Sequence, residues 1–128
     1  MWAMKSSAPM VILCVEDEEP QLELRKMLFE SAGFEFVGAR RGAEALELFQ
    51  TKNISVVVLD YWMSGMNGME LASEMKRLRP TIPIIMLSGF PSLPGEGVGL
   101  VDAWFQKARV EPEALIERVS ELIKRNPG

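Results

Sequence analysis

The chain has 128 residues, of which 48% are hydrophobic and 25% are charged, and its formal net charge is −4. This balance is typical of one globular domain and excludes a fibrous or disordered chain. No apolar stretch approaches the ~20 residues of a membrane span, and direct nucleic-acid binding is disfavoured because it normally needs a cationic face. The chain has no histidine, so it lacks the commonest metal ligand and general base.

The only cysteine, Cys14, lies within the apolar run Met10–Val15, where we expect a buried thiol rather than a nucleophile. Because one cysteine cannot form a disulfide within the chain, we expect a reducing, cytoplasmic setting. Residues 1–9 lack the apolar core of a secretory signal and are predicted to be a disordered leader. Residues 10–125 are predicted to form a single folded domain.

The run Met10–Val15 is also the first predicted strand, because continuous apolar runs are typical of strands that are buried on both faces of a parallel sheet. A helix is predicted after it, with Pro20 in the first turn and Gly33 at the end. The predicted apolar face of this helix consists of Leu24, Met27 and Leu28.

The middle of the chain repeats the alternation. Phe34–Ala39 is a weaker strand candidate, and a second helix is predicted after it. The apolar positions of that helix are Ala45, Leu46 and Phe49. Val56–Leu59 predicts the third strand. A third helix follows, with Asn67 as its N-cap and Glu70 three residues later. Its apolar positions are Leu71, Met75 and Leu78.

The last third holds two more strands and a helix. Ile82–Leu87, which Pro83 interrupts, predicts the fourth strand, and Ala103–Phe105 is a weaker fifth. The final helix begins near Pro112. Its apolar stripe consists of Leu115, Val119, Leu122 and Ile123. Strands that alternate with helices predict an α/β fold, a doubly wound parallel sheet with helices on both faces.

One connection departs from this pattern. Residues Gly89–Leu100 contain two prolines and four glycines. Glycine costs a helix interior about 1 kcal/mol and proline about 3 kcal/mol. We therefore expect the fourth helix of the fold to be missing or much reduced.

Polar residues follow the predicted strands at the edge where ligands bind in such sheets. Glu16 and Asp17 follow the first strand, Asp60 the third, Ser88 the fourth and Lys107 the fifth. Clustered carboxylates repel one another unless a cation joins them. Oxygen ligands without histidine or cysteine favour a hard ion such as Mg²⁺.

Each of these residues, taken alone, is also consistent with an ordinary solvent-exposed loop. Glu18 and Glu19 are expected to be first-turn acids that the helix dipole favours. The four strand ends together predict an acidic, cation-binding pocket. A carboxylate is also a known covalent nucleophile for phosphoryl transfer, but the residues alone indicate that chemistry only weakly.

Four segments, in this order, resemble the receiver (phosphoacceptor) domains of two-component response regulators. They are the acidic turn in residues 11–20, the segment 58–71 around Asp60, residues 86–89 and residues 104–107. The resemblance runs from about Met10 to Lys124, so residues 10–125 would be the receiver domain. It implies a flavodoxin-like fold, with a five-stranded parallel sheet in the order 2-1-3-4-5.

The resemblance assigns roles to the polar strand ends. Asp60 would be the phosphoacceptor, and Asp17 and Asp60 would ligate Mg²⁺ directly. Glu16, which stands where aspartate is common, would act through water, and the backbone carbonyl of Trp62 would complete the protein ligands. The protein would catalyse only its own phosphorylation and dephosphorylation and would not otherwise be an enzyme.

The same resemblance implies that Ser88 and Lys107 contact the phosphoryl group and that Ser88 and an aromatic residue on the fifth strand form the switch. Trp104 occupies the aromatic position, either as a moving switch or as a fixed core residue. Ala108 follows Lys107 where the family usually has proline. We expect a trans peptide there, because a cis bond before alanine would cost about 2.5–4 kcal/mol.

The implied phosphoryl donor is a sensor histidine kinase or phosphotransfer protein, and the output is binding to an unknown downstream protein. Two alternatives stay open. A pseudo-receiver would bind proteins without being phosphorylated, in keeping with the eroded fourth helix. A flavin- or nucleotide-binding protein of the same fold would need a phosphate-cradling turn after the first strand, and the acidic residues 16–19 would repel phosphate there.

Overall fold

The structure is a computed structural model that describes residues 9–63, 66–89 and 99–125. The predicted leader, apart from Pro9, and most of the Gly/Pro-rich connection lie outside the described residues. In chain order the elements are β1 (Val11–Val15), α1 (Glu19–Ser31), β2 (Glu35–Ala39), α2 (Gly42–Thr51), β3 (Val56–Asp60), β4 (Trp62–Met63), β5 (Met66–Asn67), α3 (Gly68–Leu78), β6 (Ile84–Ser88), β7 (Ala103–Gln106) and α4 (Pro112–Arg125).

Five of the strands form one parallel sheet in the order β2-β1-β3-β6-β7. With β6 and β7 as its fourth and fifth strands, this is the predicted order 2-1-3-4-5. The central strands β3 and β6 are buried along their whole length, as their continuous apolar sequences predict. The short antiparallel pair β4–β5 was not predicted.

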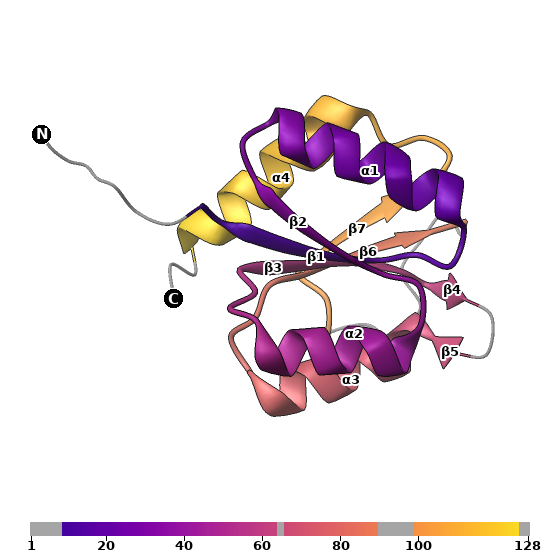
Figure 1. Ribbon diagram of the computed structural model, residues 1–128, viewed down its shortest axis with the longest axis vertical. Helices are drawn as coiled ribbons and strands as arrows, with labels where there is room; N and C mark the ends of the chain where they lie inside the picture. The colour runs from indigo at the N-terminus through magenta and orange to yellow at the C-terminus, as the bar shows by residue number, and fades with distance from the viewer. Residues whose placement is uncertain (1–8, 64–65, 90–98, 126–128) are drawn as a thin grey trace, which may run out of the picture.

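The helices cover both faces of the sheet. Figure 1 shows α1 and α4 on one face and α2 and α3 on the other. Each face has its own hydrophobic core, which the buried side chains of the strands share by alternating between faces. The predicted doubly wound α/β architecture is confirmed. No helix among the described residues is long and apolar enough to cross a membrane.

The predicted apolar face of α1 is wrong at Leu24 and Met27, whereas Leu28 is half-buried and packs against the core as predicted. Leu24 is 60% exposed and Met27 is 66% exposed, whereas Arg25 and Phe29 are buried. Phe29 sets the rotation of the helix, because it packs against two phenylalanine rings at and before β2. Arg25, four residues earlier, faces the same way, and an ion pair described below makes its burial possible. The apolar positions predicted for α2, α3 and α4 are buried or half-buried.

The start of α3 is also as predicted. Asn67 is its N-cap, and the side-chain oxygen of Asn67 accepts a hydrogen bond from the N–H of Met69 at 2.7 Å. The next residue, Gly68, has no room for a side chain, because a Cβ atom would lie 2.4 Å from the carbonyl oxygen of Asp60. The backbone of α3 therefore begins directly against the end of β3.

Between β6 and β7 the described residues contain only bends and a turn, which fits the expected reduction of the fourth helix. Asp102 fastens the entrance of β7 to its surroundings. Its carboxylate oxygen Oδ2 accepts hydrogen bonds from the N–H of Ile84 at 2.8 Å and from Nζ of Lys76 at 3.0 Å. Its backbone carbonyl accepts one from Arg118 of α4 at 3.2 Å. One residue thus joins the edge strand to a neighbouring strand and two helices.

Candidate functional site

The polar strand ends converge at one edge of the sheet. Glu16 and Asp17 follow β1, Asp60 ends β3, Ser88 ends β6 and Lys107 follows β7. These four strands are parallel neighbours, so their carboxyl ends meet at the same edge. Glu16, Asp60 and Ser88 are buried, with at most 4% of each residue exposed. Polar groups buried to this degree need partners, and Glu16 and Asp60 have theirs in nearby cations.

Three carboxylates form a cluster at this edge. One oxygen atom each from Glu16, Asp17 and Asp60 lies within 4.8 Å of the others. This donor set consists of oxygen atoms only, and such donors suit a hard divalent cation. The cluster could therefore hold a metal ion, and its chemistry fits Mg²⁺ better than a softer metal.

Lys107 binds two of the three carboxylates. Its Nζ lies 2.9 Å from Oδ2 of Asp60 and 3.0 Å from Oε1 of Glu16. Burial lowers the pKa of the Lys107 ammonium, but the hydrogen bonds to Asp60 and Glu16 outweigh burial and leave the pKa above its usual value. Lys107 is therefore a permanent cation. Its backbone N–H also donates to the carbonyl of Ser88 at 2.6 Å, which fixes the chain next to the site.

Asp60 is held in an unusual electrostatic state. Burial raises its pKa to about 6, and the hydrogen bond from Lys107 opposes this rise without cancelling it. The negative charge of Glu16 adds to the rise. Because burial makes the ionised form of Asp60 unfavourable, a cation that enters the cluster would stabilise that ionised form. Strong perturbation of a buried acid beside a specific charged partner is a mark of functional sites.

Arg25 contacts the site from the core, and the sequence analysis missed it. Its Nη1 lies 2.7 Å from Oε1 of Glu16, and both residues are buried. The second oxygen of Glu16, Oε2, accepts a hydrogen bond from the N–H of Glu18 at 3.1 Å. Cys14, also close to Arg25, is buried as expected, and burial raises the pKa of its thiol to about 11, so it is neutral. The four-residue spacing between Arg25 and Phe29, which places both on one face of α1, was the only sequence signal for the burial of Arg25.

A second arginine, Arg40, holds the acidic turn from outside. Its guanidinium donates to the backbone carbonyl of Asp17, with Nη2 at 3.1 Å and Nε at 3.3 Å. It also forms an exposed ion pair with Glu19 at 3.4 Å. The turn that carries Asp17 is thereby tied to the end of β2, and nothing in the residue pattern indicated this contact.

Trp62 and Trp104 have different environments. Trp62, two residues after Asp60, is 73% exposed. Trp104 is half-buried, and its ring lies edge-on to the ring of Tyr61, with 5.9 Å between centroids. Within the described part of the chain, the indole Nε1 of Trp104 is buried without a hydrogen-bond partner. The peptide bond before Ala108 is trans, as predicted, since the described residues contain no cis bond.

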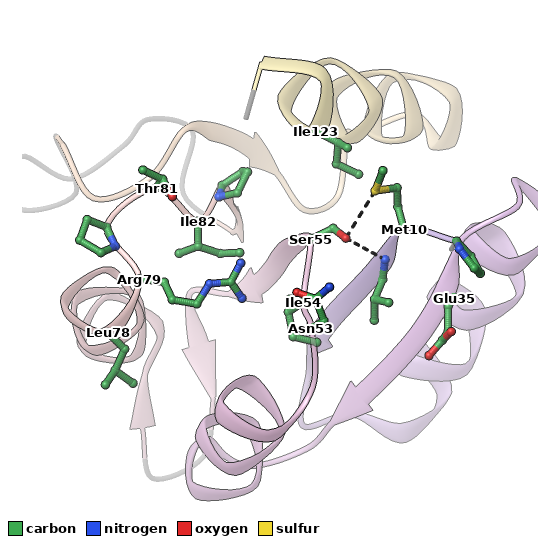
Figure 2. A pocket seen from close by; sticks show the side chains of 14 residues that line it. Met10, Glu35, Asn53, Ile54, Ser55, Leu78, Arg79, Thr81, Ile82 and Ile123 are labelled. Carbon is green, nitrogen blue, oxygen red and sulfur yellow. Dashed lines mark hydrogen bonds between the residues drawn. The ribbon is translucent and has the colours of Figure 1, made fainter. Parts of the chain in front are cut away.

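A separate pocket of about 600 Å³ lies at the opposite edge of the sheet (Figure 2). It opens beside the first residues of β1, β3 and β6, and Ile123 of α4 lines one side. Ser55 lies at its wall, accepting a hydrogen bond from the N–H of Val11 at 3.0 Å and donating one to the sulfur of Met10 at 3.6 Å. Ligands of doubly wound sheets bind at the other edge, where the carboxylates gather.

Comparison with known proteins identifies the family of the fold. A family model described as the response regulator receiver domain matches residues 12–96. The chain therefore belongs to the response regulator receiver domain family of two-component systems. Among curated proteins it is 32% identical over 123 residues to the phosphate regulon transcriptional regulatory protein PhoB from Pseudomonas aeruginosa, covering 91% of this chain and 53% of PhoB.

It is also 27% identical over 123 residues to the transcriptional regulatory protein GlrR from Escherichia coli, covering 94% of this chain and 28% of GlrR. The chain thus spans about half or less of the length of these relatives. Among solved structures, the response regulator TrrA from Thermotoga maritima in complex with Mg²⁺-BeF is 30% identical, with a TM-score of 0.81 over 88% of this chain and 98% of that one. A CheY-like receiver domain from Methanospirillum hungatei is 27% identical, with a TM-score of 0.86 over 94% and 98% of the two chains.

Proposed function

We propose that this protein is a phosphorylation-switched signalling receiver in which Asp60 accepts a phosphoryl group with the help of Mg²⁺. The observation that carries the proposal is the surroundings of Asp60. Its carboxylate is buried, lies in the cluster with Glu16 and Asp17, and contacts Nζ of Lys107 at 2.9 Å. A carboxylate nucleophile beside a fixed cation and a divalent ion is suited to phosphoryl transfer.

Asp17 and Asp60 are the direct protein ligands of Mg²⁺ in this proposal. Glu16 acts through water, because its two oxygens already accept hydrogen bonds from Arg25, Lys107 and a backbone N–H. The backbone carbonyl of Trp62 completes the set. When bound, Mg²⁺ neutralises the oxygens of the incoming phosphoryl group and orients it for in-line attack.

The donor is a phosphohistidine on a sensor histidine kinase or phosphotransfer protein. A carboxylate oxygen of Asp60 attacks the phosphorus atom, so that a P–O bond forms and the P–N bond of the donor breaks. The electron pair of that bond stays on the imidazole, which takes up a proton. The product is an acyl phosphate on Asp60, whose oxygens bind Lys107 and the hydroxyl of Ser88.

Trp104 is the proposed relay from Ser88 to a downstream protein. Among the described residues the buried indole nitrogen of Trp104 has no hydrogen-bond partner, which supports a moving switch over a fixed core residue, because a buried N–H without a partner costs stability. A histidine kinase as the donor is supported by a similar segment within the autoinducer 1 sensor kinase/phosphatase LuxN, which is 33% identical to this chain over 78 residues. The proposal also includes a cytoplasmic location, a receiver domain formed by residues 10–125, and no enzymatic activity beyond the protein's own phosphorylation and dephosphorylation.

Incubation with Mg²⁺ and acetyl phosphate tests the proposal, with intact mass as the readout. We expect a gain of one phosphoryl group that hydroxylamine removes, because it cleaves acyl phosphates. Asp60→Asn should abolish the gain, and Lys107→Met should reduce it. Glu47→Gln is the matched control, since Glu47 is an exposed carboxylate on α2 outside the cluster.

If the wild-type protein gains no mass while it still binds Mg²⁺, the pseudo-receiver function replaces the proposed one. If the gain persists in Asp60→Asn, the phosphoacceptor assignment is wrong.

A further inference from the structure

Arg25 is a buried charge that the proposed chemistry does not use. It belongs to α1, where Arg25 and Phe29 are the two buried residues, and only 8% of it is exposed. Burial of an arginine is costly unless a fully matched anion compensates it. That anion is Glu16, since the nearby thiol of Cys14 is neutral.

Glu16 is bound from two sides. On the core side its Oε1 contacts Nη1 of Arg25 at 2.7 Å, and on the pocket side the same oxygen contacts Nζ of Lys107 at 3.0 Å. Lys107 contacts both Glu16 and Asp60. To hold a phosphoryl group on Asp60, Lys107 needs its contact on the Asp60 side. Without Arg25, Lys107 would be the one cation left, among the described residues, in contact with the fully buried carboxylate of Glu16.

The charge balance of the site depends on Arg25. Among the described residues, the three clustered carboxylates face two cations, Lys107 and Arg25, so the cluster has one negative charge in excess when the exposed Glu18, 3.9 Å from Lys107, is left out of the count. Without Arg25 the excess would be two. A more negative site binds a divalent cation more tightly and an anion more weakly, and both effects are larger in a buried site than in water.

We infer that Arg25 is a positioning residue that neutralises Glu16 from the core, weakening Mg²⁺ binding and leaving Lys107 available to the phosphoryl group. This inference rests on the proposed function, because it assigns Mg²⁺ and a phosphoryl group to the cluster. It gives Glu16 and Arg25 one joint role: Glu16 supplies the charge at the edge of the sheet, and Arg25 limits it.

The test measures two affinities by calorimetry in the full chain: that of Mg²⁺, and that of beryllium fluoride, a phosphoryl mimic, at saturating Mg²⁺. Arg25→Met is expected to bind Mg²⁺ about three- to tenfold more tightly and beryllium fluoride more weakly by a similar factor. Arg25→Lys keeps the charge and should return both affinities toward wild type. Loosened packing alone would weaken both ligands and would not be rescued by lysine.

Lys26→Met is the matched control. It removes the same charge from the neighbouring position of α1, but Lys26 is exposed, so solvent and salt screen its effect. Both affinities should stay within about twofold of wild type. If Arg25→Met does not fold, Arg25→Gln, which keeps a hydrogen-bond donor near Glu16 but removes the charge, is expected to show the same opposite changes.

The outcomes separate the two claims. If wild-type protein binds neither ligand, the proposed function fails. If wild type binds both, but Arg25→Met leaves both affinities unchanged or weakens both, the role of Arg25 is refuted and the proposed function stands.

Discussion

Removal of the carboxylate of Asp60 is predicted to stabilise the metal-free protein at neutral pH. Only 4% of Asp60 is exposed, and burial raises its pKa from 3.8 to about 6. The folded protein therefore holds this proton more tightly than the unfolded chain does. The contribution of Asp60 to stability is fully present below about pH 4 and is lost as the pH rises through about 6.

The size of the effect follows from the change in pKa. Each pKa unit corresponds to about 1.4 kcal/mol, so the rise from 3.8 to about 6 makes ionised Asp60 cost the fold about 3 kcal/mol. Asparagine has a similar shape and does not titrate. The free energy of unfolding of Asp60→Asn, relative to wild type, should therefore increase by about 3 kcal/mol between about pH 4 and pH 7.

Urea denaturation in EDTA, followed by circular dichroism across this pH range, measures the difference. Saturating Mg²⁺ should then reverse the ranking at neutral pH, because a ligand stabilises the form of the protein that binds it. A difference between the two proteins that does not change with pH would refute the reasoning. It would mean that the contact with Lys107 fully compensates the burial of Asp60.

Three further predictions concern the scaffold, and urea or thermal denaturation checks each. Gly68→Ala should destabilise the protein by about 3 kcal/mol, because the added methyl group would meet the backbone of Asp60. A neutral result would show that α3 can shift away from β3. Phe29→Ala should destabilise the protein by about 3–5 kcal/mol. Leu24→Ala, at a 60% exposed position, should change stability by no more than about 0.5 kcal/mol. The opposite ranking would support the apolar face first predicted for α1. Asp102→Ala should cost about 1–3 kcal/mol, because the N–H of Ile84 loses its acceptor, and amide exchange in β7 should accelerate while exchange in β1 does not.

The sequence predicted the architecture because its signals were redundant. Continuous apolar runs identify the buried strands, and glycine, proline and Asn67 mark the helix ends. The polar strand ends were found for the same reason: parallel strands bring their carboxyl ends to one edge, so position in the chain already implies proximity in space. The three carboxylates and Lys107 meet as expected.

The predictions that failed depend on contacts between residues of different segments, and the periodicity of one segment does not encode such contacts. The hydropathy of α1 favoured Leu24 and Met27, because a lone arginine is normally exposed. Arg25 is buried because Glu16, nine residues earlier in the turn after β1, provides a buried carboxylate as its partner. The β4–β5 pair was missed because two-residue strands carry no pattern.

The bonds of Asp102 fix the start of the strand that leads to Lys107. The described contacts that secure the start of β7 come from Lys76, Ile84 and Arg118, which belong to neighbouring elements. None of these three residues belongs to the connection between β6 and β7. These contacts hold the start of β7 in place and with it Lys107, which lies just beyond the end of the strand and contacts Asp60.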